Sequence, residues 1–357
     1  MKKLNLAIIG QGRSGKNIHG RYYVSPANEY YNIRYVVDKD EWSRQQAEKL
    51  YPGCKTFSDY HELLNLKDID VIVNASYSEM HYEITKELLE NKFNVLCEKP
   101  FARSRFECDT LIKLAKDNNV LLAVFQQTFY APFNKTIGKL LEEGKLGKIE
   151  QFSIRYNNFA RRWDWQTLQK KLGGNIYNTG PHPIGLAIGF LGFDKDTQVL
   201  FSRLDKTNLS SGDSDDYAKI LLSAPNKPLV DLEISSTDAY SNYNVKIQGS
   251  NGTFKCTTTN YEYKYMLDEE NPKKPVVEET LRSADGEPIY CSENKIVHEE
   301  KGEFDGTAFD SGTSNLYEDM YYALTEGRKM FITAEIAAQI ISVIEEVHAA
   351  NHLPIKY

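Results

Sequence analysis

A loop of closely spaced glycines is the first feature of the sequence that points to chemistry. The spacing G-x-G-x-x-G directly follows an apolar run over residues 4–9, and its residues are Gly10, Gln11, Gly12, Arg13, Ser14 and Gly15. In this context the first glycine permits a tight turn, the second lets a pyrophosphate approach the backbone, and the third lets helix and strand pack closely. The N-terminus of the following helix then faces the phosphates. The motif predicts a dinucleotide-binding loop, with a plain glycine turn as the alternative.

An acidic residue lies where a dinucleotide site requires one. Asp38 ends the second predicted strand, 23 positions after Gly15. A carboxylate there binds the ribose diol of NAD, and it would repel the 2′-phosphate of NADP. Lys39 and Arg44 are near enough in sequence to offset part of that repulsion. We therefore expect NAD, with NADP as the alternative.

A lysine follows another buried strand. Residues 93–101 read FNVLCEKPF, so this strand ends at Glu98-Lys99-Pro100. The carboxyl ends of parallel strands face the ligand crevice, and Pro100 biases Lys99 away from helical torsions. Lys99 could hydrogen-bond a reacting hydroxyl and stabilise an alkoxide as a hydride leaves. The alternative is a surface lysine paired with Glu98.

The elements that must position these residues follow from the hydrophobic pattern. Short runs rich in Val, Ile and Leu, typical of strands buried on both faces, cover residues 4–9, 33–37, 71–74, 94–97 and 121–125. Amphipathic helical patterns lie between them at residues 41–50, 82–91 and 105–118. This alternation predicts βαβ units and a doubly wound parallel sheet, a Rossmann domain over residues 1–123.

The pattern changes after about residue 124. Longer and often alternating strands are predicted at residues 149–159, 197–204, 217–223, 229–235 and 245–257, with a hairpin turn at Gly249-Ser250-Asn251-Gly252. Residues 266–303 are predicted to form irregular surface strands and loops. Helices are expected at 315–326 and 333–350, the latter with a Thr333 cap. We expect a second domain over 124–357, and the pattern allows its final helix to pack back on the first.

Composition restricts the class of protein. The 357 residues carry 50 acidic and 43 basic side chains, a net charge of −7 with no basic block, so nucleic acid is not an expected partner. No apolar run approaches the ~18 residues that span a bilayer. The five cysteines form no metal-binding cluster, so no metal is expected, and a reducing cytoplasm fits them best: Cys54, Cys97, Cys108, Cys256 and Cys291.

Several motifs together resemble the glucose-fructose oxidoreductase / inositol dehydrogenase / MocA superfamily. Besides the glycine loop and Glu98-Lys99-Pro100, they are the segment 144–149 (GKLGKI), the stretch from Gly173-Gly174 to His182, and the 249–252 turn. The resemblance implies a Rossmann domain and a C-terminal α/β domain with a large mixed, mostly antiparallel sheet. It also implies NAD(P)-dependent chemistry on a sugar, polyol or related alcohol, and self-association through that sheet as a dimer or tetramer.

The resemblance also assigns the catalytic residues. It places Lys99 beside the nicotinamide and His182 where the acid/base histidine belongs, and a neutral imidazole can take an alcohol proton near neutral pH. Many members carry aspartate four residues before this histidine, whereas this chain has Asn178. An asparagine can orient a substrate hydroxyl but cannot accept a proton. Asn178 is therefore expected to be a positioning residue.

Further residues are expected around this site. The stretch 161–166 (RRWDWQ) resembles a loop at the site mouth, where Trp163 could stack on a sugar and Asp164 could bind hydroxyls, or where the loop could simply pack between domains. Ser76 and His81 fall in a family loop that lines the cofactor, and His81 could equally make a structural hydrogen bond. Gln127 and Glu98 complete the expected cofactor side. The segment 125–132 lacks an arginine that many members have, which disfavours an anionic substrate there.

Three functions fit these residues. The first is an oxidoreductase that moves a hydride between a nicotinamide and a secondary hydroxyl of a sugar, inositol or related polyol. The second is an NAD-dependent glycoside hydrolase that works by transient oxidation and elimination. The third is a dinucleotide-sensing protein without catalysis, since a fold does not dictate chemistry.

Overall fold

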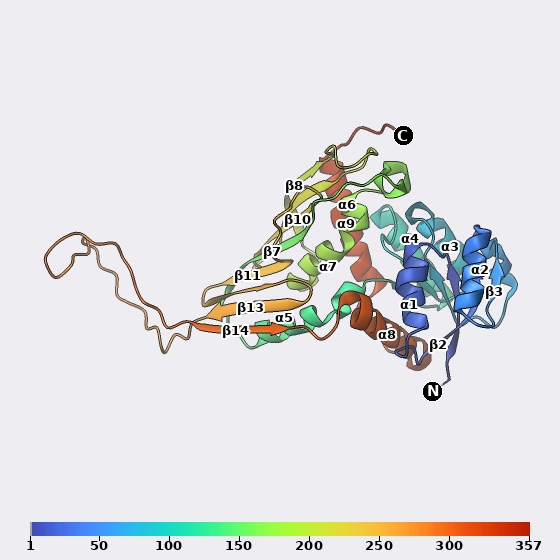
Figure 1. Cartoon of the computed structure of the whole chain (residues 1–357), viewed down its shortest axis with the longest axis horizontal. Coiled ribbons are helices and arrows are strands. Elements are labelled where there is room, and N and C mark those ends of the chain that lie inside the picture. The colour runs from blue at the N-terminus through green and yellow to red at the C-terminus, as the bar shows by residue number, and fades with distance from the viewer. Residues whose placement is uncertain (1) are drawn as a thin grey trace.

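The computed structural model describes residues 2–357 and contains two separate sheets (Figure 1). The first sheet is parallel throughout, in the order β3-β2-β1-β4-β5-β6. Its strands are β1 (Leu4–Ile9), β2 (Tyr31–Val37), β3 (Lys55–Phe57), β4 (Val71–Asn74), β5 (Val95–Cys97) and β6 (Leu122–Val124). The predicted doubly wound sheet is confirmed, and β3 is a strand that the sequence pattern did not indicate.

Helices connect these strands and cover the sheet. They are α1 (Gly20–Tyr23), which continues a π-helical turn at Gly15–His19, α2 (Glu41–Leu50), α3 (His81–Glu90) and α4 (Arg105–Asn118). The bounds predicted for α2 and α4 are confirmed. Both begin at a side-chain cap: Asp40 accepts from the backbone N–H of Ser43, and Ser104 accepts from that of Glu107.

The second sheet is large and mixed, in the order β14-β13-β12-β11-β7-β10-β9-β8. Only the central β7–β10 pair is parallel, so the predicted mostly antiparallel architecture is confirmed. Its strands are β7 (Ile149–Asn157), β8 (Gln198–Asp205), β9 (Tyr217–Ser223), β10 (Leu229–Ser235), β11 (Val245–Gly249), β12 (Gly252–Cys256), β13 (Asn260–Tyr265) and β14 (His298–Glu303). The β11–β12 hairpin turns where Gly249 to Gly252 predicted it.

The second half of the chain adds further helices. They are α5 (Pro132–Glu142), α6 (Asn175–Asn178), α7 (Pro181–Phe190), α8 (Thr313–Glu326) and α9 (Ala334–Ala350). Of these, α7 and α9 lie between the two sheets (Figure 1). α9 contacts α4 and β6 of the first sheet's unit on one side, and α7 and β8 on the other. Thr333 occupies the cap position of α9, but its side chain does not make the cap hydrogen bond to the backbone that the sequence suggested.

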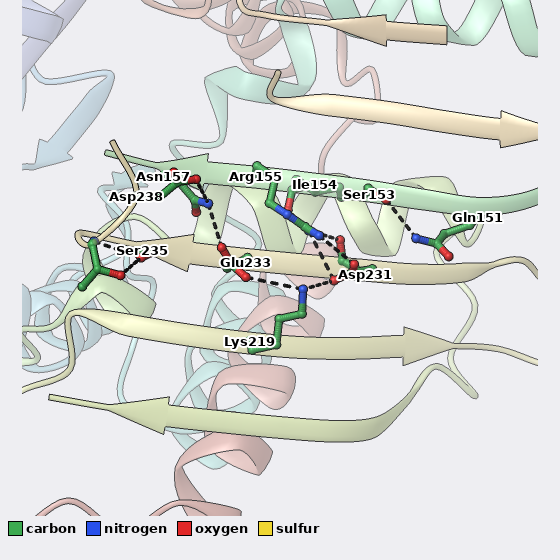
Figure 2. Close-up of polar contacts among 11 residues, drawn as sticks. Gln151, Ser153, Ile154, Arg155, Asn157, Lys219, Asp231, Glu233, Ser235 and Asp238 are labelled. Carbon is green, nitrogen blue, oxygen red and sulfur yellow. Dashed lines mark hydrogen bonds and ion pairs between the residues drawn. The ribbon is translucent and has the colours of Figure 1, made fainter. Parts of the chain in front are cut away.

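The outward face of the second sheet is built from polar side chains that bind one another, as Figure 2 shows. Arg155 donates to both carboxylate oxygens of Asp231, at 2.7 and 3.3 Å, and Lys219 pairs with the same carboxylate. Asn157 donates to Glu233 at 2.8 Å. The alternate residues of these strands, such as Phe152 on β7, point to the helices and are buried. This alternation, which is regular in β9 and nearly so in β10, explains why those strands were predictable.

None of the helices in residues 2–357 is both long and apolar enough to cross a bilayer.

Candidate active site

The glycine loop has the shape that a dinucleotide requires. Gly10 has φ of 93°, and a Cβ there would collide with the carbonyl oxygen of Ala75. A Cβ on Gly15 would collide with the carbonyl oxygen of Gly10, whereas a Cβ on Gly12 would have no protein atom within 4 Å. Two glycines are thus fixed by packing, and the second one faces open space. This is the cradle that a pyrophosphate fills, with the helix that begins at Arg13 and Ser14 directed at it.

Asp38 lies beside this loop. Its Oδ2 accepts the backbone N–H of Gln11 at 2.7 Å, and its Oδ1 accepts that of Asp40 at 2.9 Å. Each carboxylate oxygen keeps a second acceptor position, which a ribose hydroxyl can use. Arg44 is turned away from this carboxylate, since its Nη1 donates to the backbone carbonyls of Asp38 and Lys39 at 2.8 and 2.9 Å. The residues present therefore fit a bound dinucleotide.

The buried side chain of His19 supports the Glu98-Lys99 turn. His19 Nε2 lies 3.1 Å from Glu98 Oε1, and His19 Nδ1 lies 2.8 Å from the hydroxyl of Tyr317. Burial alone would raise the pKa of Glu98, but the hydrogen bond and charge of His19 outweigh it and lower the pKa to about 2. Glu98 Oε2 in turn accepts the backbone N–H of Lys99 at 2.9 Å. His19 is a supporting residue that sequence reasoning missed.

Lys99 reaches from the first sheet's unit to the second. Its Nζ donates to the backbone carbonyl of Asn178 at 3.0 Å. Burial lowers the pKa of Lys99, and the positive charges of Arg13 and Arg162 lower it further, while Glu98 raises it. The lysine thus lies between the glycine loop and the segment that carries His182. An ammonium with a lowered pKa is a better proton donor than an exposed lysine.

His182 is held by a hydroxyl rather than by a carboxylate. Its Nδ1 lies 2.8 Å from Thr128 Oγ1, which comes from the 3₁₀ turn after β6. Burial lowers the pKa of His182 to about 3, with a further contribution from the Lys99 ammonium. The imidazole is therefore neutral near pH 7. Lys99 binds the carbonyl of Asn178, four residues before His182, so its ammonium reaches the segment that carries this imidazole.

Asn178 is part of a polar chain across the site. Its Oδ1 accepts from Gln166 Nε2 at 2.7 Å, and Gln166 Oε1 accepts from Arg162. Arg162 Nε also donates to Asp164 at 2.7 Å. Asn178 is thus tied to Lys99 through its backbone and to the 161–166 loop through its side chain. Gln166 in this role was not anticipated.

The two tryptophans of the 161–166 loop behave differently. Trp163, the predicted stacking residue, is 79% exposed. Trp165 instead packs edge-on against Tyr77 of the first sheet's unit, with ring centroids 5.0 Å apart. Lys171 pairs with Glu79 beside this contact. The loop therefore bridges the two units, which is the packing alternative, and it does so through Trp165.

The other predicted cofactor residues are Ser76, His81 and Gln127, and they differ in their partners. Ser76 donates to Asn74 Oδ1 at 2.7 Å. His81 is buried, with Nδ1 2.7 Å from the carbonyl oxygen of Pro100 and Nε2 3.2 Å from that of Ser76, and burial lowers its pKa. His81 therefore makes a hydrogen bond to the Lys99-Pro100 turn, which agrees with the alternative that His81 has a structural role. Gln127 is buried, and its Oε1 has no hydrogen-bond partner among the described residues.

Comparison with known proteins agrees with this geometry. The profile of the Gfo/Idh/MocA oxidoreductase family, NAD-binding Rossmann fold, matches residues 4–126, and that of its C-terminal alpha/beta domain matches residues 138–352. The scyllo-inositol 2-dehydrogenase (NADP(+)) of Bacillus subtilis is 25% identical over 194 residues, 54% of this chain and 53% of that protein. The 2,7-anhydro-N-acetylneuraminate hydratase of Mediterraneibacter gnavus is 24% identical over 260 residues, 71% of this chain and 67% of that protein.

Solved structures share the fold. A NAD-binding protein from Listeria innocua has a TM-score of 0.80 at 18% identity, over 98% of both chains. A mutant 3-ketoreductase from Actinomadura kijaniata, in complex with TDP-benzene and NADP, has a TM-score of 0.79 at 16% identity, also over 98% of both chains. The resemblance found in the motifs is thereby confirmed: the chain belongs to the Gfo/Idh/MocA oxidoreductase family, with an NAD-binding Rossmann domain followed by a C-terminal α/β domain.

Proposed function

We propose that this oxidoreductase transfers a hydride between a nicotinamide cofactor and a secondary hydroxyl of a sugar, inositol or related polyol. The observation that carries the proposal is the approach of Lys99 to Asn178, four residues before His182. This contact brings an ammonium from one unit to the segment of the other unit that carries the imidazole. A hydroxyl bound there would meet a hydrogen-bond donor and a proton acceptor together.

The side chains divide the work of alcohol oxidation as follows. A bound nicotinamide supplies the hydride acceptor. When His182 Nδ1 donates to Thr128, its Nε2 keeps the lone pair that takes the hydroxyl proton. Lys99 donates a hydrogen bond to the same oxygen and stabilises the negative charge that develops on it. Asn178 and Gln166 orient neighbouring hydroxyls. In the reverse direction His182 returns the proton.

The cofactor that this site favours is NAD. Asp38 retains acceptor positions for both ribose hydroxyls, while Arg44 is committed to backbone carbonyls. A thermal-shift comparison at equal concentrations tests this preference, because the tighter ligand stabilises the protein more. A larger shift with NADP would contradict our assignment of Asp38.

Single-turnover absorbance with bound NAD and a panel of sugars and inositols tests the reaction itself. We expect at least one polyol to raise the absorbance of the reduced nicotinamide. If NAD binds and no sugar or inositol reduces it, and no 3-keto sugar oxidises NADH, the proposal is wrong.

A net reaction without net redox change is the second candidate. It is favoured by the similarity to proteins named 2,7-anhydro-N-acetylneuraminate hydratase, from two bacteria. Transient oxidation activates an adjacent carbon for elimination, and the same Lys99 and His182 would serve it. Product analysis separates the two, since elimination or hydrolysis releases a fragment without accumulating NADH.

We further propose that the chain self-associates through the outward face of its second sheet. Arg155 and Lys219 pair with Asp231 and Glu233, so the two positive and two negative charges leave this face with little uncompensated charge to desolvate. Sedimentation of an Asp231→Lys variant tests this interface.

A further inference from the structure

An arm of the second sheet extends away from the rest of the molecule. Residues 267–297 connect β13 to β14 and project beyond both sheets, at the left of Figure 1. At its base Asn271 binds Ile296 twice, through Nδ2 to the carbonyl at 3.0 Å and through Oδ1 from the backbone N–H at 2.8 Å. At its tip Ile289 N–H donates to the carbonyl of Leu281 at 2.9 Å.

Between base and tip the backbone of the arm is unpaired. Residues 272–280 make no backbone–backbone hydrogen bond to any residue that the structure describes. The arm also exposes large apolar side chains: Val276 is 91% exposed, and Tyr290 is 95% exposed. An isolated two-stranded ribbon is marginally stable in water at best. Unpaired backbone and exposed apolar groups on an extended segment are what another strand can pair with.

The outgoing leg of the arm is complementary to itself. Residues 273–279 read Lys-Lys-Pro-Val-Val-Glu-Glu. If this segment pairs with a second copy in antiparallel orientation with Val276 opposite Val276, Lys273 lies opposite Glu279 and Lys274 lies opposite Glu278. At both ends of the pair, a positive side chain then lies opposite a negative one. A two-fold axis through Val276 makes the contact the same for both chains.

The single proline is compatible with this register. In an antiparallel ladder, alternate residues direct their N–H groups to the partner strand. With Val276 as a hydrogen-bonded pair, Lys274 and Glu278 also donate to the partner, while the N–H positions of residues 275 and 277 point away. Pro275 therefore removes no hydrogen bond from the pair.

We propose that residues 273–279 form an antiparallel strand pair with the same segment of a second copy of this chain. Lys274 already pairs with Glu293 of its own arm at 3.1 Å, but Lys274 is 68% exposed and such surface pairs contribute little, so it is available for exchange. A second copy of the chain carries the charge pattern that this segment matches. No feature of the sequence specifies a different protein as the partner.

Charge reversal with rescue tests the pairing. Two variants each place like charges opposite one another, K273E/K274E and E278K/E279K. Sedimentation equilibrium should give each variant a dissociation constant at least ~10-fold higher than that of the native chain, for the association step that the arm mediates. Mixing the two variants, or combining all four substitutions, should restore association. The control F106D changes a side chain on α4 that is 77% exposed and should have no effect.

The result does not depend on how many other contacts hold the assembly. If the outward face of the second sheet also associates, the variants form only the assembly that this face holds. If it does not, the variants are monomers. Native-like association by both variants would overturn the proposal, as would a native chain that is monomeric at ~50 μM, a concentration at which specific interfaces are normally occupied. Association that is weakened in both variants and not restored on mixing would instead indicate a different partner segment, and would also overturn it.

Cysteine cross-linking gives an independent test that does not rely on charge. Cα atoms of a hydrogen-bonded antiparallel pair lie about 5.5 Å apart, within the range of a disulfide. In a parent with the exposed Cys291 changed to serine, V276C should form a disulfide-linked dimer under mild oxidation by oxidised glutathione. The matched control A284C, at the tip of the arm, should stay monomeric on a non-reducing gel. Equal cross-linking of both variants would contradict the register.

Discussion

At the scale of single residues, the orientation of the His182 ring depends on an uncharged hydrogen-bond partner, Thr128. Burial lowers the pKa of the His182 imidazole to about 3. Thr128 contributes the only side-chain hydrogen bond to the ring among the residues described, at 2.8 Å. The hydroxyl thus fixes which ring nitrogen carries the proton, a role that a carboxylate has in many enzymes.

We predict that Thr128→Val lowers kcat about 10-fold or more while the affinity for NAD stays within about threefold. The substitution keeps the volume and removes the hydroxyl that orients His182. Thr128→Ser is the matched control, because it retains the hydroxyl, and it should keep most of the activity. Steady-state kinetics together with NAD titration measure both quantities. A Val variant as active as the Ser variant would show that the hydroxyl does not orient the ring.

The pKa of His182 also predicts a dependence of stability on pH. An unfolded histidine takes up its proton near pH 6.5, whereas His182 in the folded protein does so only near pH 3. The stability contributed by the neutral ring is therefore present above pH 6.5 and falls as the pH decreases from 6.5 toward 3. Urea unfolding of His182→Gln across this range should show a smaller loss than the native chain. An identical loss would contradict the buried neutral imidazole.

Individual site residues could be predicted from sequence where a motif carries them. Gly12, Lys99 and His182 were predicted in this way: Gly12 faces open space in the loop, and Lys99 reaches the carbonyl of Asn178, four residues before His182. His19 was missed because its partner Glu98 is 79 residues away and no motif links them. Trp165 was missed in favour of Trp163 because spacing within a loop does not determine which side chain faces a neighbour.

At the scale of elements, the short helix α6 shows how the site is supported. Asp215 Oδ2 accepts the backbone N–H of Ile176 at 2.8 Å, at the start of the turn that ends in Asn178. Gly174 precedes it with φ of 104°, and a Cβ there would collide with Asp215 Oδ1. The carboxylate thus holds in place the turn whose last carbonyl binds Lys99.

We predict that Asp215→Asn becomes more stable relative to the native chain as the pH rises from about 4 to 7. Burial raises the pKa of Asp215 from 3.8 to about 7, so over this range the folded chain holds a proton that the unfolded chain releases, and this costs folding free energy that increases with pH. The asparagine oxygen can still accept from Ile176 and carries no charge. Chemical unfolding at several pH values measures the difference between the two proteins. A difference that is constant with pH would mean that Asp215 ionises normally.

An element could be predicted from the sequence when one of its faces is buried and the other faces water. Strands β9 and β10 were predicted with their observed bounds because one face is buried and the other polar. Helix α7 was not predicted, since it is apolar on nearly all sides and has no amphipathic period. Strand β3 is three residues long at a sheet edge, too short for a pattern.

At the scale of the whole molecule, the site depends on the contact between the two units. Besides α9, which touches both, the contact includes the Trp165–Tyr77 pair and the ion pair of Lys171 with Glu79. Asn178, whose carbonyl binds Lys99, is also hydrogen-bonded by Gln166, the residue next to Trp165. Holding the loops together therefore keeps the ammonium and the imidazole in register.

We predict that Trp165→Ala lowers the free energy of unfolding by about 1–3 kcal/mol, because it removes a packed aromatic pair between the units. Trp163→Ala, two residues away, removes a side chain that is 79% exposed and should change it by less than about 0.5 kcal/mol. Denaturant titration of both variants measures the contrast. Equal effects would contradict the assignment of Trp165 to the contact.

The convergence of Lys99 and His182 on one substrate oxygen is tested most directly by single-turnover hydride transfer in Lys99→Ala and His182→Ala, once an active polyol is known. The account predicts that each variant reduces bound NAD at least ~100-fold more slowly than the native chain, with NAD affinity within about threefold. Lys113→Ala, on the exposed surface of α4, should react at the native rate. A native rate in either active-site variant, with NAD and polyol bound, would contradict it.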